Sequence, residues 1–392
     1  MPRPPLPLPP ALDEVLARAE AKGHAAFLVG RAIPALLRGE TPPEFEVWVE
    51  ATQDALRKLF PCAVTGVGSR WLLLPSAAGP IDLHGLTDAS ALEAALARRD
   101  FRAHAIAYRA SEARFVDPFA GFDDIAAKRL SAVGDPVASL AADPLRALRA
   151  IDLASTHALT LDPALADALP SASPALKALR GPRVRRELDA MLLAPRAGDA
   201  VRRLREARIE PALVPGARND APCVIERLPP DLALRWAAWL RDTAVVLLMR
   251  NLRMPRDRAS RIERWLLRHP VEAGNAAALA GRARRLLHRD AEDREPLLAL
   301  RRAEIQPGDA EALASFVRLE EALARQREAD ERAARRQSLA IDGSQVMHHL
   351  GCRPGAHVGQ ALRHLTEQIT ADPAQNEPAR LLALLDAWWA KQ

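Results

Sequence analysis

A chain of 392 residues is too long for a single hydrophobic core, so we expect it to divide into two to four modules. Hydrophobic residues make up 49% of the sequence but aromatic residues only 4%, which favours a mainly helical protein packed through small aliphatic side chains. Lysine and arginine outnumber aspartate and glutamate by 55 to 50. This small excess permits a polyanionic partner without requiring one, because a solvated surface with a few extra arginines gives the same count.

The first 120 residues mix short strands with helices. A helical periodicity over residues 11–22 leads into an apolar strand at Phe27–Val29, which ends at Gly30. A short apolar helix at Ala32–Leu37 is followed by a Pro-Pro turn and a second strand that reaches residue 49. Further strands are expected at 63–67, 71–74, 80–83 and 114–116, with a helix at 52–60 and a helix-like segment at 102–108. This mixture predicts an α/β head of about 120 residues.

Two carboxylates stand on alternate residues of the second predicted strand. Glu44 and Glu46 therefore point to the same face, and Asp82 lies on a later strand. Neighbouring acids repel each other, so folded proteins usually present such a pair to a cation. Glycine, helix, turn and acid-x-acid in this order are typical of nucleotidyltransferases that hold two Mg²⁺ ions over a triphosphate. An edge strand with two solvated glutamates explains this stretch equally well.

Beyond residue 125 nearly all of the sequence has helical spacing, interrupted by clusters of Pro and Gly. Asp143, Arg146 and Arg149 recur every three residues, so they share one face of a predicted helix. An Asp–Arg pair within the helix, with one exposed Arg, would give the same pattern. Arg241-Asp242 and His348-His349 have no partners at metal-ligand spacing, so we expect both pairs on helix surfaces.

The cysteines and the apolar runs indicate a cellular location. Cys62, Cys223 and Cys352 lie far apart in the sequence and lack metal-ligand spacing, which favours a reducing, cytoplasmic environment. The proline-rich start of the sequence lacks the apolar segment of a signal peptide. No apolar run reaches the ~18 residues that a membrane span needs, so no membrane partner is expected.

Eight separated segments resemble class II tRNA nucleotidyltransferases (CCA-adding enzymes) and bacterial poly(A) polymerases. They are LVGR (28–31), EFEV (44–47), RRDFRAHAIAY (98–108), DPFAGFDDI (117–125), VGDP (133–136), DPLRALRA (143–150), PRVRREL (182–188) and LAIDGSQVMHHLGCRPGAHVGQAL (339–362). The resemblance implies an α+β fold, in which a mixed-sheet nucleotidyltransferase head of the polymerase-β type precedes an all-helical neck, body and tail. We place these modules at residues 1–125, 126–195, 196–305 and 306–392, with an RNA-binding tail.

The same resemblance implies chemistry at RNA 3′ ends. Family members use Mg²⁺ to transfer nucleotide from ATP or CTP to tRNA, and the 3′-hydroxyl attacks the α-phosphate in line. Glu44, Glu46 and Asp82 stand at the catalytic positions, and the first two also at the metal positions. The positions implied for nucleotide binding are Gly30, Arg31, Arg99, Asp100, His104, Asp143, Arg146, Arg149 and Arg183.

Arginine clusters in the neck and tail are expected to contact RNA phosphates. They comprise Arg180, Arg183, Arg185 and Arg186 in the neck and Arg332, Arg335 and Arg336 in the tail. Solvated helix faces, in which these arginines pair with neighbouring glutamates, are the alternative explanation.

The sequence departs from the family pattern where catalysis would take place. Glu44 and Glu46 replace two aspartates, which adds a methylene to each ligand of an ion that demands near-ideal octahedral geometry. The other replacements are Arg31 for the second glycine of a Gly-Gly turn, Pro34-Ala35 for Arg-Asp, His104 for Asn and Asp152 for Arg. We therefore expect transfer to be weakened or lost, as in a pseudoenzyme. Three functions remain open: a transferase with an altered metal site, an inactive homologue that binds tRNA or another structured RNA, and a nucleotide-sensing protein.

Overall fold

The computed structural model describes residues 5–65, 71–87, 89–179, 181–269, 271 and 276–390. The chain forms two compact units, Met1–Leu267 and Arg268–Gln392, and each is described by itself. The boundary between the units lies inside the segment expected to form the body. The other expected module boundaries stay predictions.

A seven-stranded mixed sheet in the order β3-β4-β5-β2-β1-β6-β7 forms the centre of the head. The strands are β1 (Ala26–Val29), β2 (Phe45–Val49), β3 (Val64–Thr65), β4 (Trp71–Leu74), β5 (Ile81–Gly85), β6 (Ala107–Arg109) and β7 (Arg114–Val116). Strands β2 and β5 run parallel, with Glu46 opposite Asp82. Strand β1 is antiparallel to β2, with Val29 opposite Glu46. The pairing therefore brings the predicted catalytic acids of two distant segments onto neighbouring strands.

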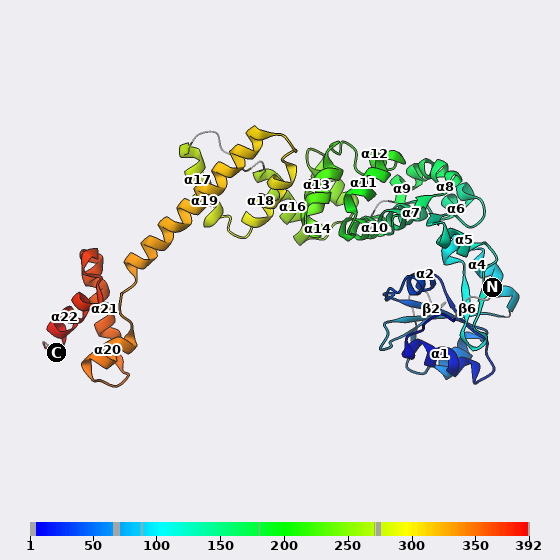
Figure 1. Cartoon of the computed structure of the whole chain (residues 1–392), viewed down its shortest axis with the longest axis horizontal. Coiled ribbons are helices and arrows are strands. Elements are labelled where there is room, and N and C mark those ends of the chain that lie inside the picture. Colours follow the sequence, from blue (N-terminus) through cyan, green and yellow to red (C-terminus); the bar gives the residue numbers. More distant parts are fainter. Residues whose placement is uncertain are drawn as a thin grey trace. The chain divides into compact units, whose positions relative to one another are not determined.

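Helices cover both faces of this sheet, seen in the blue-to-cyan part of the ribbon in Figure 1. They are α1 (Pro10–Glu20), α2 (Ala32–Leu37), α3 (Gln53–Leu59), α4 (Ala89–Leu96) and α5 (Gly121–Ala126). Successive strand residues enter opposite cores: Leu28 packs with residues of α1 and α2, whereas Val29 packs with residues of α4. This alternation fixes the register of β1 and places Gly30 at its end.

The rest of the first unit is helical. Its helices are α6 (Pro136–Ala142), α7 (Leu145–Thr156), α8 (Pro163–Ala168), α9 (Ser173–Leu179), α10 (Pro182–Leu193), α11 (Ala197–Glu206), α12 (Glu210–Leu213), α13 (Ala221–Arg227), α14 (Leu232–Leu240), α15 (Val245–Asn251) and α16 (Arg256–Arg268). A two-stranded parallel sheet, β8 (Arg129–Leu130) with β9 (Thr160–Leu161), ties the end of the head to α7. Helix α7 is buried along Leu148 and Ile151 and contacts α10 and α11, so packing among these helices fixes its position.

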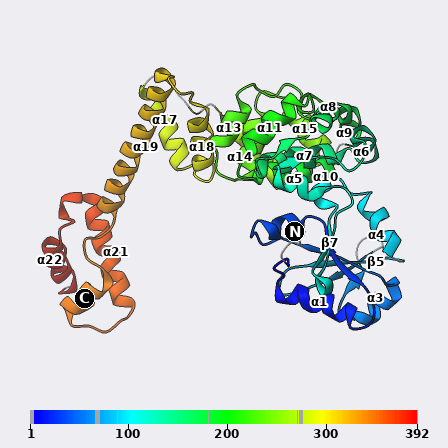
Figure 2. The same cartoon turned by 45° about the vertical axis from the view of Figure 1, so that its right-hand side comes forward.

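The second unit is entirely helical in its described part. Its helices are α17 (Ala276–Leu287), α18 (Arg294–Glu304), α19 (Ala310–Gln337), α20 (Gly343–Leu350), α21 (Ala356–Ala371) and α22 (Pro378–Trp389). Helices α20, α21 and α22 lie side by side (Figure 2) around a core that includes Val346, Leu365 and Leu385. Across the described residues, no helix is long and apolar enough to cross a bilayer.

The structure corrects two local predictions. Residues 102–108 do not continue as a helix: a 3₁₀ turn at Arg102–His104 gives way to β6, because Tyr108 pairs with Leu28 in the sheet. Arg241-Asp242 does not lie on a helix surface, since α14 ends at Leu240 and Asp242 adopts a left-handed turn with φ of 62°. The expected strand at 63–67 is observed at 64–65, and its last two residues lie outside the described part of the chain. His348 and His349 lie on α20 as predicted.

Candidate functional site

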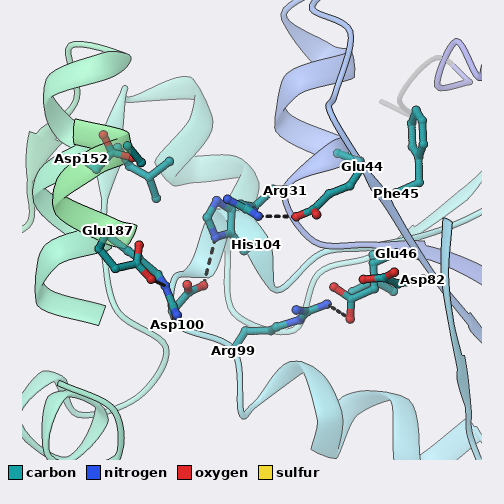
Figure 3. Close-up of a pocket in the computed structure, with 15 residues that line it drawn as sticks. Arg31, Glu44, Phe45, Glu46, Asp82, Arg99, Asp100, His104, Asp152 and Glu187 are labelled. Atoms are coloured by element: carbon teal, nitrogen blue, oxygen red, sulfur yellow. Dashed lines mark hydrogen bonds and ion pairs between the residues drawn. The ribbon is translucent and has the colours of Figure 1, made fainter. Parts of the chain in front are cut away.

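A pocket of about 390 Å³ opens beside the edge of the sheet where β2 begins. Charged side chains dominate its lining: Arg31, Glu44, Glu46, Asp82, Arg99, Asp100, His104, Arg149, Asp152 and Glu187. Figure 3 shows Glu46, Asp82 and Arg99 on one side and Asp152 and Glu187 on the facing helices. The structure thus places the three predicted catalytic acids in one pocket.

Arg31 forms an ion pair with Glu44. The Nη2 atom of Arg31 donates to Oε1 of Glu44, and the two form an ion pair drawn as a dashed line in Figure 3. Arg31 is the residue before α2, so the short helix holds its side chain over the start of β2. The carboxylate at the first predicted metal position therefore already has a cationic partner.

Arg99 forms an ion pair with Glu46. Its Nη2 atom lies 2.6 Å from Oε1 of Glu46, while its guanidinium carbon stands 5.0 Å from the ring centroid of Trp48. Nη2 makes no well-aligned hydrogen bond in the described residues, so the contact with Glu46 is chiefly electrostatic. The indole Nε1 of Trp48 donates to the same carboxylate oxygen at 2.7 Å. Glu46 thus has one hydrogen-bond donor, Trp48, and one cationic neighbour, Arg99, which neutralises its charge.

Gly30 makes the approach of Arg99 and Glu46 possible. Its φ of +87° lies in the left-handed region that favours glycine. A Cβ atom there would stand 3.3 Å from both Arg99 Nη2 and Glu46 Oε2. Gly30 is not itself among the residues that line the pocket, so its role is to admit the ion pair.

Asp82 differs from the two glutamates because it has no cationic partner in the described residues. Burial and the nearby carboxylates of Glu44 and Glu46 raise the pKa of Asp82. His84, two residues along β5, has its pKa lowered by burial, an effect that Glu46 opposes. Asp82 is therefore the one of the three acids whose carboxylate has no cation beside it in the described part of the chain.

Asp100 and His104 form a second pair at the pocket wall. His104 Nδ1 lies 3.0 Å from Asp100 Oδ1, and the backbone N–H of Phe101 donates to the same carboxylate at 2.9 Å. Burial would raise the pKa of Asp100, but His104 and this backbone hydrogen bond hold it well below its usual range. Both residues lie where the sequence predicted them, at the pocket.

Only one of the three predicted neck residues lines this pocket. Arg149 does so, and it contacts Glu187 at 3.1 Å and Asp143 at 3.4 Å. Arg146 points elsewhere, donating to Ser139 Oγ and to the carbonyl of Arg98, both at 2.7 Å. Asp143 and Arg183 lie behind Arg149, 3.9 Å apart. The three residues predicted to share one helix face therefore do not act together. Arg149 lines the pocket, whereas Arg146 connects α7 to the head through the carbonyl of Arg98.

Asp152 lies on α7 with its carboxylate largely out of solvent. Burial raises the pKa of Asp152 to about 6, and Glu187 adds to the rise. A hydrogen bond from Thr156 at 3.4 Å and the charge of Arg31 oppose it. Where the resemblance implies an arginine, this chain thus has an acid whose pKa is raised to about 6.

The carboxylates at the predicted metal positions do not fit a pair of Mg²⁺ ions in this arrangement. Each glutamate is neutralised by an arginine, and Mg²⁺ requires free oxygen ligands at about 2.0–2.1 Å. Within the described ranges, no group of three or more His, Cys, Asp or Glu side chains has the geometry to hold a metal. Only Asp82 retains an uncompensated carboxylate among these three acids.

Sequence reasoning missed three residues of this site. Trp48 lies two residues after Glu46 on β2, and His84 lies two residues after Asp82 on β5. Each therefore shares a face of its strand with the acid, and the same period-two argument could have found it. Glu187 follows Arg183 by four residues on α10, and that spacing also places two side chains on one helix face. The pairing of Arg31 with Glu44 has no sequence signal, because it depends on the chain path between β1 and β2.

Only some of the arginines that were expected to contact phosphates are exposed to solvent in the described part of the chain. Arg183 and Arg186 are exposed. Arg185 instead donates to the carbonyl of Leu252 at 3.3 Å and to that of Arg253, and it lies 3.5 Å from Asp189, so it joins α10 to the helices behind it. Arg332 is exposed and pairs with Glu328. Arg180 and the side chains of Arg335 and Arg336 lie outside the described part.

Comparisons with known proteins agree with this architecture. A family described as "Probable RNA and SrmB- binding site of polymerase A" matches residues 158–220. The A-adding tRNA nucleotidyltransferase of Deinococcus radiodurans is 27% identical over 87% of this chain and 91% of its own length. Poly(A) polymerase I of Salmonella typhi is 26% identical over 52% of this chain and 49% of its own. These matches support the resemblance to tRNA nucleotidyltransferases and bacterial poly(A) polymerases that the sequence motifs predicted.

Solved structures of this family share the fold. The CCA-adding enzyme of Bacillus stearothermophilus in complex with CTP matches with a TM-score of 0.64 at 20% identity, covering 98% of this chain and 99% of that one. The Thermotoga maritima CCA-adding enzyme complexed with tRNA matches with a TM-score of 0.61 at 16% identity, covering 96% and 94%. The predicted α+β class, with a nucleotidyltransferase head followed by helices, is confirmed.

Proposed function

We propose that the protein recognises the 3′ end of tRNA or another structured RNA, and that its transfer of ATP or CTP to that end is weakened or lost. The observation that carries this proposal is the double ion pair in the head, Arg31 with Glu44 and Arg99 with Glu46. Arginine side chains take the place that cations would take in a working two-metal site. The family's reaction depends on those cations to neutralise the triphosphate, so we infer that the chemical step is impaired.

RNA binding does not depend on the head's acids. Exposed arginines such as Arg183 and Arg186 can contact phosphates without a metal, and the matched RNA-binding family spans the helices that carry them. Relatives of this chain act on RNA 3′ ends, as A-adding and poly(A)-adding enzymes. We propose a cytoplasmic location, since Cys62 and Cys223 are exposed, free thiols that suit a reducing compartment.

The experiment is a paired measurement on one preparation. Filter binding with tRNA that lacks its 3′ terminal nucleotides should show affinity that falls linearly on a log–log salt plot. Radiolabelled ATP or CTP should not be incorporated into the same RNA above background with Mg²⁺. Incorporation at the speed of an ordinary family member would overturn the loss of transfer, and absence of tRNA binding at low salt would overturn the RNA partner.

A five-fold variant provides the matched positive control. Glu44→Asp, Glu46→Asp, Arg31→Gly, Pro34→Arg and Ala35→Asp together restore the residues that the resemblance implies at five positions of the head, and leave His104 and Asp152 unchanged. We expect this variant to gain measurable incorporation, whereas Glu44→Asp and Glu46→Asp alone should gain little because Arg31 stays in place.

A second candidate is a slow transferase with a Glu-x-Glu site that binds Mg²⁺ weakly. The observation in its favour is that Glu44, Glu46 and Asp82 line one pocket, in which no described cation pairs with Asp82. Slow wild-type incorporation that rises with Mn²⁺ would support this candidate over the inactive homologue.

A further inference from the structure

A second cavity, of about 450 Å³, lies beside the first in the same compact unit. The two cavities share Arg31, Glu44, His104 and Asp152 in their linings. The other walls of the second cavity come from α2, the loop after α2, the segment from α5 to β8, and α7. Its volume falls within the range of small-molecule sites in proteins, about 300–1,000 Å³.

Apolar side chains form a large part of the lining. Pro34 and Ala35 come from α2, Leu153 comes from α7, and Leu159 follows α7. A metal ion requires several oxygen ligands and gains nothing from such a surface, whereas an aliphatic group is stabilised by leaving water for it. The lining therefore favours a ligand with an aliphatic body.

Most of the charged residues around the second cavity pair with one another. Arg38 makes two hydrogen bonds to Glu40, at 2.8 and 2.7 Å. Arg129 donates to the fully buried Asp124 through Nε and Nη2 at 2.9 and 2.8 Å. The ion pair between the residues at positions 31 and 44 is the third such pair. These side chains therefore bring little net charge to the cavity.

Asp152 is a carboxylate of the lining that lacks a cationic partner. It accepts one long hydrogen bond, from Thr156 Oγ1 at 3.4 Å, and makes no ion pair with any described residue. Burial raises its pKa to about 6, an effect to which Glu187 adds and which Arg31 opposes. A carboxylate that is withdrawn from water without a counter-charge is stabilised by a cation that reaches it.

Lys128 offers the opposite charge at the same cavity. It lies exposed in the turn after α5 and also lines the cavity. It makes no ion pair in the part of the chain that the structure describes. One cavity thus presents an unpaired carboxylate, an unpaired ammonium group and apolar surface.

We propose that the second cavity binds a small aliphatic zwitterion, an amino acid whose ammonium group contacts Asp152 and whose carboxylate contacts Lys128. A primary ammonium group has three N–H donors and no acceptor, so it complements a carboxylate that accepts only one long hydrogen bond. The aliphatic stem of the ligand packs on the apolar lining. This site is independent of the proposed function, because it involves neither RNA nor nucleotide transfer.

The test is calorimetric titration of the full chain with EDTA present and without RNA. Leucine, 4-aminobutyrate and 6-aminohexanoate are compared because the distance between their two charges differs. The tightest of the three should bind about ten-fold more tightly than the analogues that lack its ammonium or its carboxylate group, which corresponds to one charge-assisted hydrogen bond at each end. Equal affinity for those analogues, or no binding of any of the three zwitterions at millimolar concentration, would overturn the proposal.

Two charge-removing substitutions assign the ends of the ligand. Asp152→Asn should abolish the preference for the zwitterion over the analogue without an ammonium group, and exposed Asp167→Asn on α8 is its control. Lys128→Gln should abolish the preference over the analogue without a carboxylate, and exposed Lys177→Gln on α9 is its control. A preference that survives unchanged in Asp152→Asn or Lys128→Gln would contradict the assigned contact.

A space-filling substitution locates the ligand in the second cavity. Ala35 lines this cavity and not the first, so Ala35→Leu should abolish binding. Ala17→Leu, on the exposed face of α1, should leave it unchanged. Binding that persists in a folded Ala35→Leu variant would place the ligand elsewhere and contradict the proposal.

Titration at pH 5 and at pH 7.5 tests whether Asp152 must be ionised. An ammonium group pairs with the ionised carboxylate, and the pKa of Asp152 before binding is about 6, so the wild type should bind about ten-fold more weakly at pH 5. The other charged or titratable groups around Asp152 are Arg31, Glu44, His104, His157 and Glu187. Protonation of either histidine would also act in Asp152→Asn, so that variant should bind weakly and independently of pH. Equal wild-type affinity at both pH values, or a pH dependence that Asp152→Asn retains, would overturn the role of Asp152 and with it the proposed site.

Discussion

Arginine–carboxylate pairs occur in two regions of the first unit, with different partners and exposure. In the head, the side chains of Arg31 and Glu44 are 64% and 49% exposed. Behind α10, Glu210 is 3% exposed and is bound by Arg205 and by the indole N–H of Trp239 at 2.8 Å. The buried carboxylate is saturated by donors that also join α11, α12 and α14.

The difference indicates what each set of pairs contributes. Removing one member of a buried pair leaves an uncompensated group in a low-dielectric interior, which costs several kcal/mol. An exposed pair contributes about 0–1 kcal/mol because water screens both charges. The fold therefore depends on the Glu210 network, whereas the exposed Arg31–Glu44 pair changes the chemistry of the pocket and adds little stability. Substitutions in the two regions should separate these effects.

The largest effect is expected from Glu210→Ala. It should lower the free energy of unfolding by about 3 kcal/mol, because the Trp239 N–H and the Arg205 guanidinium lose a buried acceptor. Chemical denaturation of the full chain, followed by tryptophan fluorescence, measures this loss. Glu206→Ala, on an exposed position of α11, is the control and should change stability by less than about 0.5 kcal/mol. A loss below about 1 kcal/mol in Glu210→Ala would contradict the contrast.

An intermediate effect of opposite sign is expected from Asp152→Asn. The pKa of Asp152 is raised to about 6 in the folded chain, so the folded state loses stability as pH rises from about 4 to 6 and the carboxylate ionises. The neutral amide of the variant carries no such penalty, so the variant should be about 2 kcal/mol more stable above pH 7. Melting curves at pH 4 and pH 8 check this, and a stabilisation that is equal at both values would count against burial as the cause.

The smallest effect is expected from Arg31→Ala. Because the Arg31–Glu44 pair is exposed, its loss should change the free energy of unfolding by less than about 1 kcal/mol. The same denaturation series measures it, with Arg38→Ala as a matched control that breaks another exposed pair, Arg38–Glu40. A loss of several kcal/mol would show that the head pair holds the fold.

Much of this arrangement was predictable from the sequence. Period-two placement put Glu46 on one strand and Asp82 on another, and the parallel pairing of β2 with β5 brings Glu46 opposite Asp82. Glu44, predicted on the same strand as Glu46, instead lies one residue before β2. The positive φ at Gly30 follows from the sharp turn expected after the first strand. Local periodicity sufficed in these cases because each residue's direction is set by its own strand or turn.

The remaining contacts depend on tertiary structure. Arg146 shares a helical face with Arg149 in sequence, yet it is drawn away by Ser139 and by the carbonyl of Arg98. The segment 102–108 has helical composition, but strand pairing with β1 overrides that propensity. The arginine partners of the two glutamates come from distant segments of the head, and no local pattern signals such contacts.

Manganese binding tests most directly whether the arginines neutralise the head's acids. Mn²⁺ takes the same oxygen ligands as Mg²⁺, and its free fraction is measured by electron paramagnetic resonance. We expect the wild type to bind no Mn²⁺ at the head below millimolar concentration. The combined variant Arg31→Gly, Arg99→Gln should gain one site, which Asp82→Asn then removes. Tight wild-type binding that Asp82→Asn abolishes would contradict the account, because it would show Glu44, Glu46 and Asp82 holding a metal despite their arginine partners.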